Sequence, residues 1–430
     1  MAFSFVSSAQ NADSTQNAFS LRQCIEYALS HHPLLKQAQI NEEITNASNA
    51  IDLSARYPQI NGNGTLTHYL QLPTIFTDQN GNPSTTHTGV RNTFIPGVSV
   101  SQAIFSPALI YATKVTTLYS EQARQITDST KINLVVTVSK SFYNLLLTFQ
   151  EIGVLKEDTV RLGQSLRDAY HQYVGGIVDE TDYEQATISL NNSVAELNQA
   201  NENIAPQYAS LKQAMGYPAE QHFNLVYDST EMMQEIAADT TKALNYNKRI
   251  EFQELNTRKD IQHKLTEYYH LAAWPTISGI FNYNYEFQNS AFSKLFSTSF
   301  PYSFVGLTFS IPIFTGFNRV ENARRSNLME QSLDWSLQNL RASIYSEYKA
   351  ALASYKSNMF NLQTTKTNRD LARRVYFVVT LQYKEGIVPY LNVITAETNL
   401  ITSEINYQNA LFQVLSSKVD LERAMGDVEW

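Results

Sequence analysis

Apolar residues recur at every third or fourth position over very long stretches of this chain, which is the period of an amphipathic helix. The clearest such stripe in the first half comprises Val135, Val138, Phe142, Leu145, Phe149 and Ile152. The strictest heptad stripe in the second half comprises Leu391, Ile394, Thr398, Ile401, Ile405, Gln408, Phe412, Leu415 and Val419. These stripes predict long helices over about 107–173 and 318–383, each followed by a return helix. Helices of roughly 65 residues are on the order of 100 Å long and are typical of coiled-coil packing.

Proline residues interrupt the remaining helical patterns. One helix is predicted over about 21–55 and is divided at Pro33, because the residue before a proline resists the α conformation. Another is predicted over about 241–273. Pro206 lies inside the first return helix and predicts a kink there.

The period changes to two in four shorter segments, which predicts strands. They lie at about 59–70, 93–105, 276–288 and 302–314, and residues 71–92 between the first two read as a loop. Each predicted strand has an apolar face and a face of small polar residues. This alternation fits a barrel wall between lipid and lumen. It also fits a soluble sheet with one solvated side.

The order of elements occurs twice. Gly-Ile-Val at 176–178 returns at 386–388, and Ala-Met-Gly at 214–216 returns at 424–426, each after 210 residues. The duplication predicts a first repeat at 19–216 with a hairpin tip at 173–183, and a second at 241–426 with a tip at 383–391. Outside the two repeats lie residues 1–18, read as disordered or a signal-peptide remnant, a connector at 217–240, and a C-terminal end at 427–430.

The composition of the chain excludes several classes of function. The net charge of −8, with acidic and basic residues mixed, argues against nucleic-acid binding. The single cysteine, Cys24, excludes an internal disulfide or a cysteine zinc cluster, and we interpret it as a buried thiol rather than a lipidation site. No run approaches the ~18 apolar residues of a membrane-spanning helix. We find no enzyme signature and expect no cofactor and no metal site.

Four amphipathic strands cannot close a barrel alone, since the smallest bacterial barrels have eight. Unpaired strand edges are untenable in lipid, so the strands must pair with other chains, and cyclic symmetry closes such a ring. Three chains would supply twelve strands and a matching cylinder of long helices.

Taken together, the paired Gly-Ile-Val tips, the paired Ala-Met-Gly helix ends and the aromatic-proline strand entries at 57–58 and 274–275 resemble the outer membrane efflux protein (TolC-like) family. The resemblance implies a mainly α fold with a transmembrane β-barrel contribution. Each chain would give a duplicated helix–strand–strand–long helix–helix unit and four strands of a 12-stranded barrel, above a long α-helical barrel ringed by the connector. It implies a homotrimer in the outer membrane of a Gram-negative bacterium, in contact with lipid, with a periplasmic α-helical extension. Such a duct passes small molecules, metal ions or proteins from an inner-membrane transporter, through a periplasmic adaptor, to the outside, as part of an efflux or type I secretion system.

The resemblance also implies roles for the tips. Residues placed at the periplasmic gate are Thr181, Asp182, Tyr383, Asn392 and Thr395. Residues placed at the hairpin tips and in adaptor docking are Gly175, Gly176, Ile177, Val178, Gly386, Ile387 and Val388. We expect Asp182 and Tyr383 to hydrogen-bond across neighbouring hairpins in the resting state. The family's gate arginine corresponds to Val388, so that restraint is missing here.

The residues of the first tip leave two interpretations open. Asp179, Glu180, Asp182 and Glu184 would surround a threefold axis and favour cations. Alternatively, acidic residues simply stabilise a helix N-terminus. For the whole chain, the alternative class is a periplasmic coiled-coil adaptor or scaffold protein. The exported substrate and the identity of pump and adaptor cannot be read from the residues.

Overall fold

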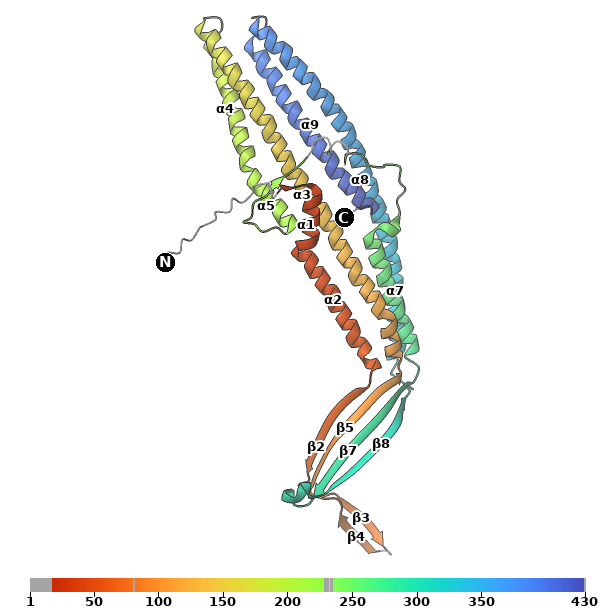
Figure 1. Ribbon diagram of the computed structural model, residues 1–430. Helices are drawn as coiled ribbons and strands as arrows, with labels where there is room; N and C mark the ends of the chain where they lie inside the picture. Colours follow the sequence, from red (N-terminus) through yellow and green to blue (C-terminus); the bar gives the residue numbers. More distant parts are fainter. Residues whose placement is uncertain (1–17, 80–81, 228–231, 233–234, 429–430) are drawn as a thin grey trace, which may run out of the picture. The chain divides into compact units, whose positions relative to one another are not determined.

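The computed structural model describes residues 18–79, 82–227, 232 and 235–428 (Figure 1). The expectation for the N-terminal segment therefore falls mostly on residues 1–17, outside the described residues. The chain forms two compact units. The helical unit comprises residues 1–40, 125–254 and 337–430, and the sheet unit comprises residues 41–124 and 255–336. Each unit contains segments of both sequence repeats. The boundaries of the two compact units therefore do not coincide with the boundaries of the repeats.

Long helices dominate the fold, as the apolar stripes predict. They are α3 (Pro107–Val174), α4 (Glu180–Glu202), α5 (Ile204–Met215), α8 (Asn318–Lys384) and α9 (Tyr390–Met425). The break between α4 and α5 falls at Asn203. Pro206 thus occupies the first turn of α5, where its missing N–H costs no helical hydrogen bond. The break is a local unwinding of one residue: Asn203 keeps helical backbone angles, and its N–H still bonds to the carbonyl of Gln199 at 3.1 Å.

The shorter helices are α1 (Leu21–His31), α2 (Pro33–Leu53) and α7 (Ile250–Leu271), with 3₁₀ turns at Ser54–Arg56 and Tyr246–Lys248. Pro33 begins α2, which confirms the predicted division. The helix predicted from residue 241 starts nine residues later. The side chains of Asp239 and Asn245 accept hydrogen bonds from the N–H groups of Thr241 and Asn247, and these local turns replace the first helical turns.

Helix α3 contains one 18-residue window apolar enough to cross a membrane by length and composition, with a mean hydropathy of 1.3. The sequence interpretation had found no such run. However, 56% of this window is buried within the fold. That burial is typical of a core helix.

The main core of the helical unit forms around the stripe predicted for α3. Val138, Phe142 and Leu145 of this stripe are fully or almost fully buried. They pack with residues of α1, α5, α8 and the C-terminal half of α9, among them Cys24, Leu211, Met215, Tyr355, Leu411, Val414 and Leu415. Cys24 is therefore a buried thiol, as interpreted.

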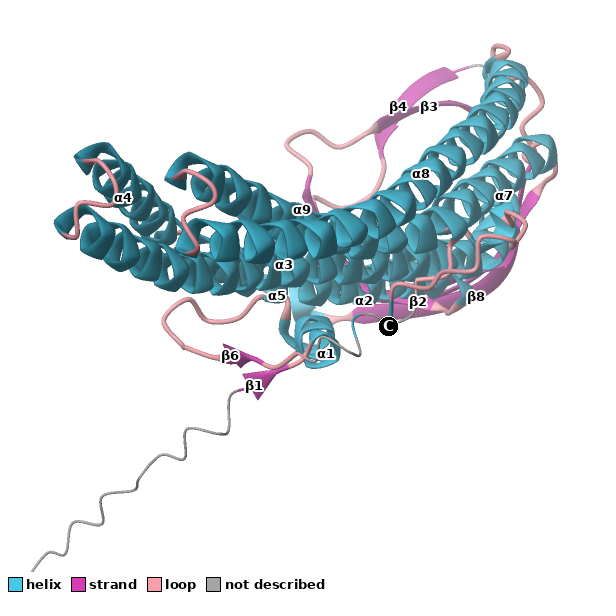
Figure 2. Cartoon of the chain, turned by 90° about the horizontal axis from the view of Figure 1, so that it is seen from above, coloured by secondary structure: helices cyan, strands magenta, loops and turns pink. Residues whose placement is uncertain are grey.

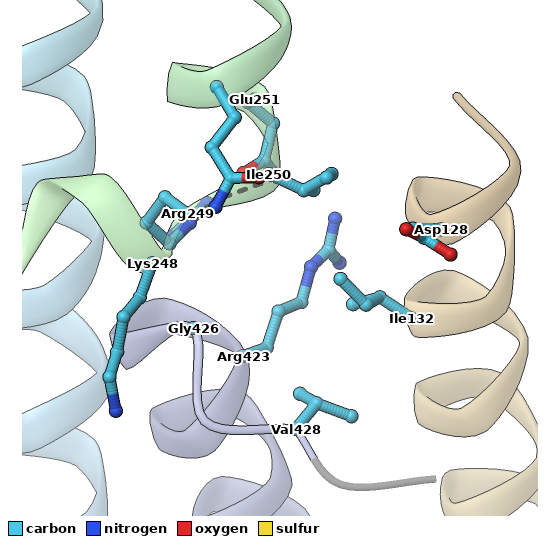
Figure 3. A pocket seen from close by; sticks show the side chains of 10 residues that line it. Asp128, Ile132, Lys248, Arg249, Ile250, Glu251, Arg423, Gly426 and Val428 are labelled. Carbon is cyan, nitrogen blue, oxygen red and sulfur yellow. Dashed lines mark hydrogen bonds and ion pairs between the residues drawn. The ribbon is translucent and has the colours of Figure 1, made fainter. Parts of the chain in front are cut away.

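The C-terminal end of α9 is anchored by close contacts (Figure 3). The guanidinium of Arg249 donates a hydrogen bond to the carbonyl of Ala424 at 3.0 Å and also pairs with the carboxylates of Glu251 and Glu347. Gly426, with φ 73°, lies so close to Lys248 that an added Cβ would be 2.7 Å from the Lys248 carbonyl oxygen. The first repeat has an equivalent contact, because a Cβ on Gly216 would lie 2.9 Å from the Cα of His32.

A small parallel pair also belongs to the helical unit. β1 (Ala18–Phe19) pairs with β6 (Asn224–Leu225), which lies in the predicted connector. This pair joins the start of the first repeat to the connector at 217–240.

The sheet unit contains a four-stranded antiparallel sheet in the order β2 (Gln59–His68), β5 (Asn92–Phe105), β7 (Thr276–Asn289), β8 (Ser299–Ser310). The first three strands lie close to the predicted positions. The strand predicted at 302–314 begins three residues earlier and ends four residues earlier. Strands of both repeats pair in this sheet, since β5 and β7 are its two central strands.

The predicted loop 71–92 is wrong in part. It contains the strands β3 (Thr74–Gln79) and β4 (Asn82–His87), which form an antiparallel hairpin. The threonines of this segment favour extended backbone, and the hairpin pairs its own backbone groups.

The two faces of the sheet differ largely as the alternation predicts, with exceptions on β5, β7 and β8. One row across all four strands consists of Ile60, Val100, Phe281 and Val305. The next row, on the opposite face, consists of Asn61, Ser99, Asn282 and Phe304. The first half of β8 also places Phe300 and Tyr302 on this mostly polar face, which includes Ile95 of β5 and Ile280 of β7 as well.

Candidate functional site: the hairpin tips and the seam behind them

Each long hairpin reverses through the same backbone motif. The N–H of Gly176 bonds to the carbonyl of Tyr173 and the N–H of Ile177 to that of Gln172, at 2.9 Å each. In the second tip Gly386 bonds to Tyr383 and Ile387 to Gln382, at 2.9 and 2.8 Å. This is the Schellman motif, in which a left-handed residue satisfies the last carbonyls of a helix. Gly176 and Gly386 have φ 67° and 72°, which explains the glycine at both positions.

The predicted docking residues are largely open to solvent in the single chain. Ile177 and Ile387 are 74% and 68% exposed, and Gly175, Gly176 and Gly386 are exposed as well. Val178 and Val388 are partly buried. Exposed isoleucines at both tips present apolar surface that a partner can cover.

The two hairpins touch close to their tips, and Figure 2 shows them side by side. A cluster of buried residues there joins all four helices: Ala169 of α3, Ala186 of α4, Tyr383 of α8, and Tyr390 and Val393 of α9. We call it the tip cluster. The rings of Tyr383 and Tyr390 lie 5.3 Å apart. The alanines allow the tyrosine rings to approach the first hairpin closely.

Within one chain, the predicted gate residues Asp182 and Tyr383 lie near each other but form no hydrogen bond. Tyr383 is 5% exposed, and its hydroxyl has no hydrogen-bond partner among the described residues. Burial, with the charges of Asp182 and Asp168, raises the pKa of Tyr383 to about 12. Burial and then the charge of Asp179 raise the pKa of Asp182. The hydroxyl of Tyr383 thus remains a donor, with an acidic residue close by.

The other predicted gate residues lie on the surface of this single chain. Thr181, Asn392 and Thr395 are exposed. The hydroxyl of Thr395 donates to the carbonyl of Leu391 in its own helix at 2.9 Å. Asp179 is the N-cap residue of α4, but its side chain makes no capping hydrogen bond. This leaves the Asp179 carboxylate available to the solvent.

Behind the tips, the contact between the hairpins becomes polar, and sequence reasoning missed this region. Asp168 of α3 lies 3.8 Å from Lys384 of α8. Further from the tip, Arg161 of α3 lies 3.6 Å from Glu404 of α9 and 3.3 Å from Asp158 on its own helix. Asp158 is fully buried and accepts a 2.7 Å hydrogen bond from Ser193 of α4. We call the residues Asp158, Arg161, Asp168, Tyr376, Lys384, Glu397 and Glu404 the polar seam.

Sequence reasoning missed the polar seam because the most apolar face of α9 near the tip is not the face that is buried. The buried face lies beside it. The buried positions near the tip are Tyr390, Val393, Ala396, Glu397, Leu400, Glu404 and Tyr407. In the predicted stripe, by contrast, Leu391 is 59% exposed, and Ile394 and Ile401 are only partly buried. The three-four spacing of the two glutamates with aromatic and aliphatic residues is the sequence signal that marks them.

The part of the predicted stripe nearest the tip instead lines a groove of about 400 Å³, whereas Phe412, Leu415 and Val419 further along it are buried in the core as predicted. Ile394, Ile401 and Ile405 form one wall, and Ser189, Asn192 and Glu196 of α4 form another. Asp158 and Glu397 also line it. The groove therefore joins the surface of both hairpins to the buried carboxylates of the seam.

Comparison with known proteins agrees with this architecture. Residues 24–217 match the model of the outer membrane efflux protein family, which accounts for most of the first repeat. No curated protein matches the sequence. The structure of the channel protein CusC is similar over 94% of this chain and 91% of its own, with a TM-score of 0.78 and 18% identity.

The resemblance to the outer membrane efflux protein family is confirmed. VceC of Vibrio cholerae has a TM-score of 0.75 at 14% identity, over 94% of this chain and 96% of its own. The MtrE channel of Neisseria gonorrhoeae, in its open state, has a TM-score of 0.73 at 16% identity, over 94% of this chain and 88% of its own. At these identities the structures establish the shared fold. The outer-membrane location expected from the sequence agrees with this family.

Proposed function

We propose that this chain is one third of a trimeric outer-membrane exit duct. The observation that carries the proposal is the sheet of four strands. Among the described residues β2 and β8 each pair on one side only, although rows such as Ile60–Val100–Phe281–Val305 present apolar side chains. Val305 is 82% exposed in the single chain. An exposed apolar face with unpaired edges is stable in lipid only when further strands close it. Three copies forming a twelve-stranded barrel meet this requirement.

In this proposal the two hairpins of each chain form the periplasmic end of the duct, and their tips form its entrance. Ile177 and Ile387 meet a periplasmic adaptor, which connects the duct to an inner-membrane pump. Asp182, Thr181, Tyr383, Asn392 and Thr395 line or restrain the entrance. The hydroxyl of Tyr383 is buried without a partner near Asp182 of the adjoining hairpin, which supports such a restraint. The duct carries cargo without chemical conversion, so we propose no catalytic role.

The alternative of a soluble adaptor or scaffold has less support. It accounts for long hairpins but not for the apolar face of the sheet, which would be in contact with water. It also has no counterpart among the similar structures described above, which are those of the channel-forming CusC, the outer membrane protein VceC and the outer membrane channel MtrE.

Fractionation and electrical recording test the proposal together. The chain should enter the outer-membrane fraction as an SDS-resistant oligomer and form channels in planar bilayers. Replacing Asp182 by alanine and Tyr383 by phenylalanine should raise the single-channel conductance, because both members of the restraint are lost. Glu202→Ala, an exposed acidic residue at the other end of the same helix, serves as a control for the loss of charge. A soluble monomer without channel activity would refute the duct, and unchanged conductance of the double variant would refute the restraint.

A further inference from the structure

The polar seam contains a carboxylate whose surroundings do not suit its charge. Glu397 on α9 is 2% exposed, and neither of its carboxylate oxygens has a well-formed hydrogen bond to any described residue. The hydroxyl of Tyr376 on α8 favours the ionised form of this carboxylate, but less than any other neighbouring group that acts on it. An ionised carboxylate is strongly disfavoured in such a place unless it is paired.

Charged and titratable groups face Glu397 from each neighbouring helix. Asp158 on α3 is fully buried and repels a second negative charge, and Glu196 on α4 lines the same groove. Arg161 on α3 is the nearby cation, but its guanidinium already lies within 4 Å of three other carboxylates, those of Asp158, Glu157 and Glu404. Glu397 has no ion pair among the described residues.

The second arginine near the seam does not pair with Glu397 either. Arg373 on α8 contacts Glu404 at 2.8–2.9 Å and so belongs to a different carboxylate. Burial and the charge of Asp158 together outweigh Arg161 and Tyr376 and raise the pKa of Glu397 to about 7. The neutral acid therefore prevails in the packed state below neutral pH.

The position of Glu397 couples this protonation to the packing of the hairpins. Asp158 and Arg161 belong to the first hairpin, whereas Glu397, Glu404 and Tyr376 belong to the second. Further from the tips the same helices are joined by apolar residues such as Leu145 and Val414, which do not titrate. Separation at the tips would bring water to Glu397 and leave the apolar core intact.

We propose that Glu397 is a proton-controlled latch between the two hairpins. Protonated, it stays buried and holds α9 against α3; ionised, it favours separation of the tips, where water solvates its charge. The latch concerns the packing of one chain, and only its consequence for opening rests on the proposed function as a duct.

The sign of the effect follows from the two states. In the separated state Glu397 returns to its ordinary pKa of 4.5, whereas in the packed state the pKa is about 7. Packing is therefore fully favoured below pH 4.5 and weakens as the pH rises toward 7. The total change is at most about 300-fold in the ratio of packed to separated hairpins, since each unit between the two pKa values contributes a factor of ten. Above pH 7 no further change is expected.

Hydrogen exchange of the full-length protein in detergent tests the latch. After correction for intrinsic exchange, protection of residues 390–404 should fall by up to about 300-fold from pH 4.5 to pH 8. Residues 411–425 of the same helix, in the apolar core, provide an internal reference that should not change. Infrared spectroscopy should show a buried carboxylic acid that titrates near pH 7 in the wild type and is missing in Glu397→Gln.

Three variants separate this inference from simpler explanations. Glu397→Gln should keep its acid-pH protection at every pH, and Asp158→Asn should lower the midpoint because it removes the repelling charge. Glu385→Gln, an exposed glutamate at the second tip, should behave as the wild type. Equal pH dependence in the wild type and Glu397→Gln would overturn the latch.

A cation could replace the proton as the ligand of this groove. The described residues contain no group of three or more metal-binding side chains, so we expect magnesium chloride at pH 8 to leave the exchange unchanged. Restored protection in magnesium would identify a cation site and overturn the latch. None of these measurements requires channel activity. A failure of the proposed duct function would be detected by conductance, independently of the result for the latch.

Discussion

Two matched pairs of glycines separate backbone strain from steric contact in this fold. Gly176 and Gly216 both have φ 67°, and Gly386 and Gly426 have φ 72° and 73°. No described atom lies within 4 Å of a Cβ added to Gly176 or Gly386, at the tips. A Cβ on Gly216 would lie 2.9 Å from the backbone of His32, and one on Gly426 would lie 2.7 Å from that of Lys248. Alanine at the four positions thus meets the same strain but different neighbours.

The expected magnitudes follow from these contacts. The left-handed conformation costs alanine about 1–2 kcal/mol at every position. Overpacking against backbone that cannot move away adds about 1–3 kcal/mol. We therefore expect Gly176→Ala and Gly386→Ala to lose about 1–2 kcal/mol of unfolding free energy, and Gly216→Ala and Gly426→Ala about 2–5 kcal/mol.

Urea denaturation followed by far-UV circular dichroism measures these differences, provided that the slope with denaturant is unchanged. The comparison within each pair cancels the strain and the loss of chain entropy, because both members have the same φ and the same substitution. Equal losses within a pair would refute the argument, since they would show that the close approach at Gly216 or Gly426 relaxes without cost.

Two further predictions follow from individual side chains. Arg161→Met removes the ion pair to Glu404 that crosses the hairpins, so at pH 5.5 it should raise the open probability in bilayers about 5- to 30-fold, as expected for about 1–2 kcal/mol. Arg373→Met, which removes a contact within the second hairpin, is the control, and an equal effect of both would contradict this account. Burial raises the pKa of the Cys24 thiol to about 12, so at pH 8 the native protein should not react with a maleimide and the denatured protein should; rapid native labelling would show that α1 is detached from the core.

The elements of this fold could be read from the chain because they depend on local patterns. The stripe from Val135 to Ile152 marks the buried side of α3 directly, since one helix face meets one core. The glycines at both tips and both helix ends were found from repetition alone, and each has the positive φ that its motif requires. The predicted start of α7 failed because side chains compete locally with the helix for backbone hydrogen bonds. Asp239 and Asn245 accept bonds from nearby N–H groups, and turns form in place of the first helical turns.

The tertiary structure alone decided which face of α9 is buried near the tips, whereas further along the helix Phe412, Leu415 and Val419 of the predicted stripe do lie in the core. Leu391, Ile394 and Ile401 form the more hydrophobic stripe, and from the sequence this stripe is the natural core. The packing of two hairpins against each other turns the neighbouring stripe inward, and with it Glu397 and Glu404. Sequence patterns record how hydrophobic each face of a helix is, but the face that becomes buried also depends on helices more than 200 residues apart in the chain. The charge balance of the seam, in which Arg161 is engaged by other carboxylates and Glu397 is left without an ion pair, exists only in that arrangement.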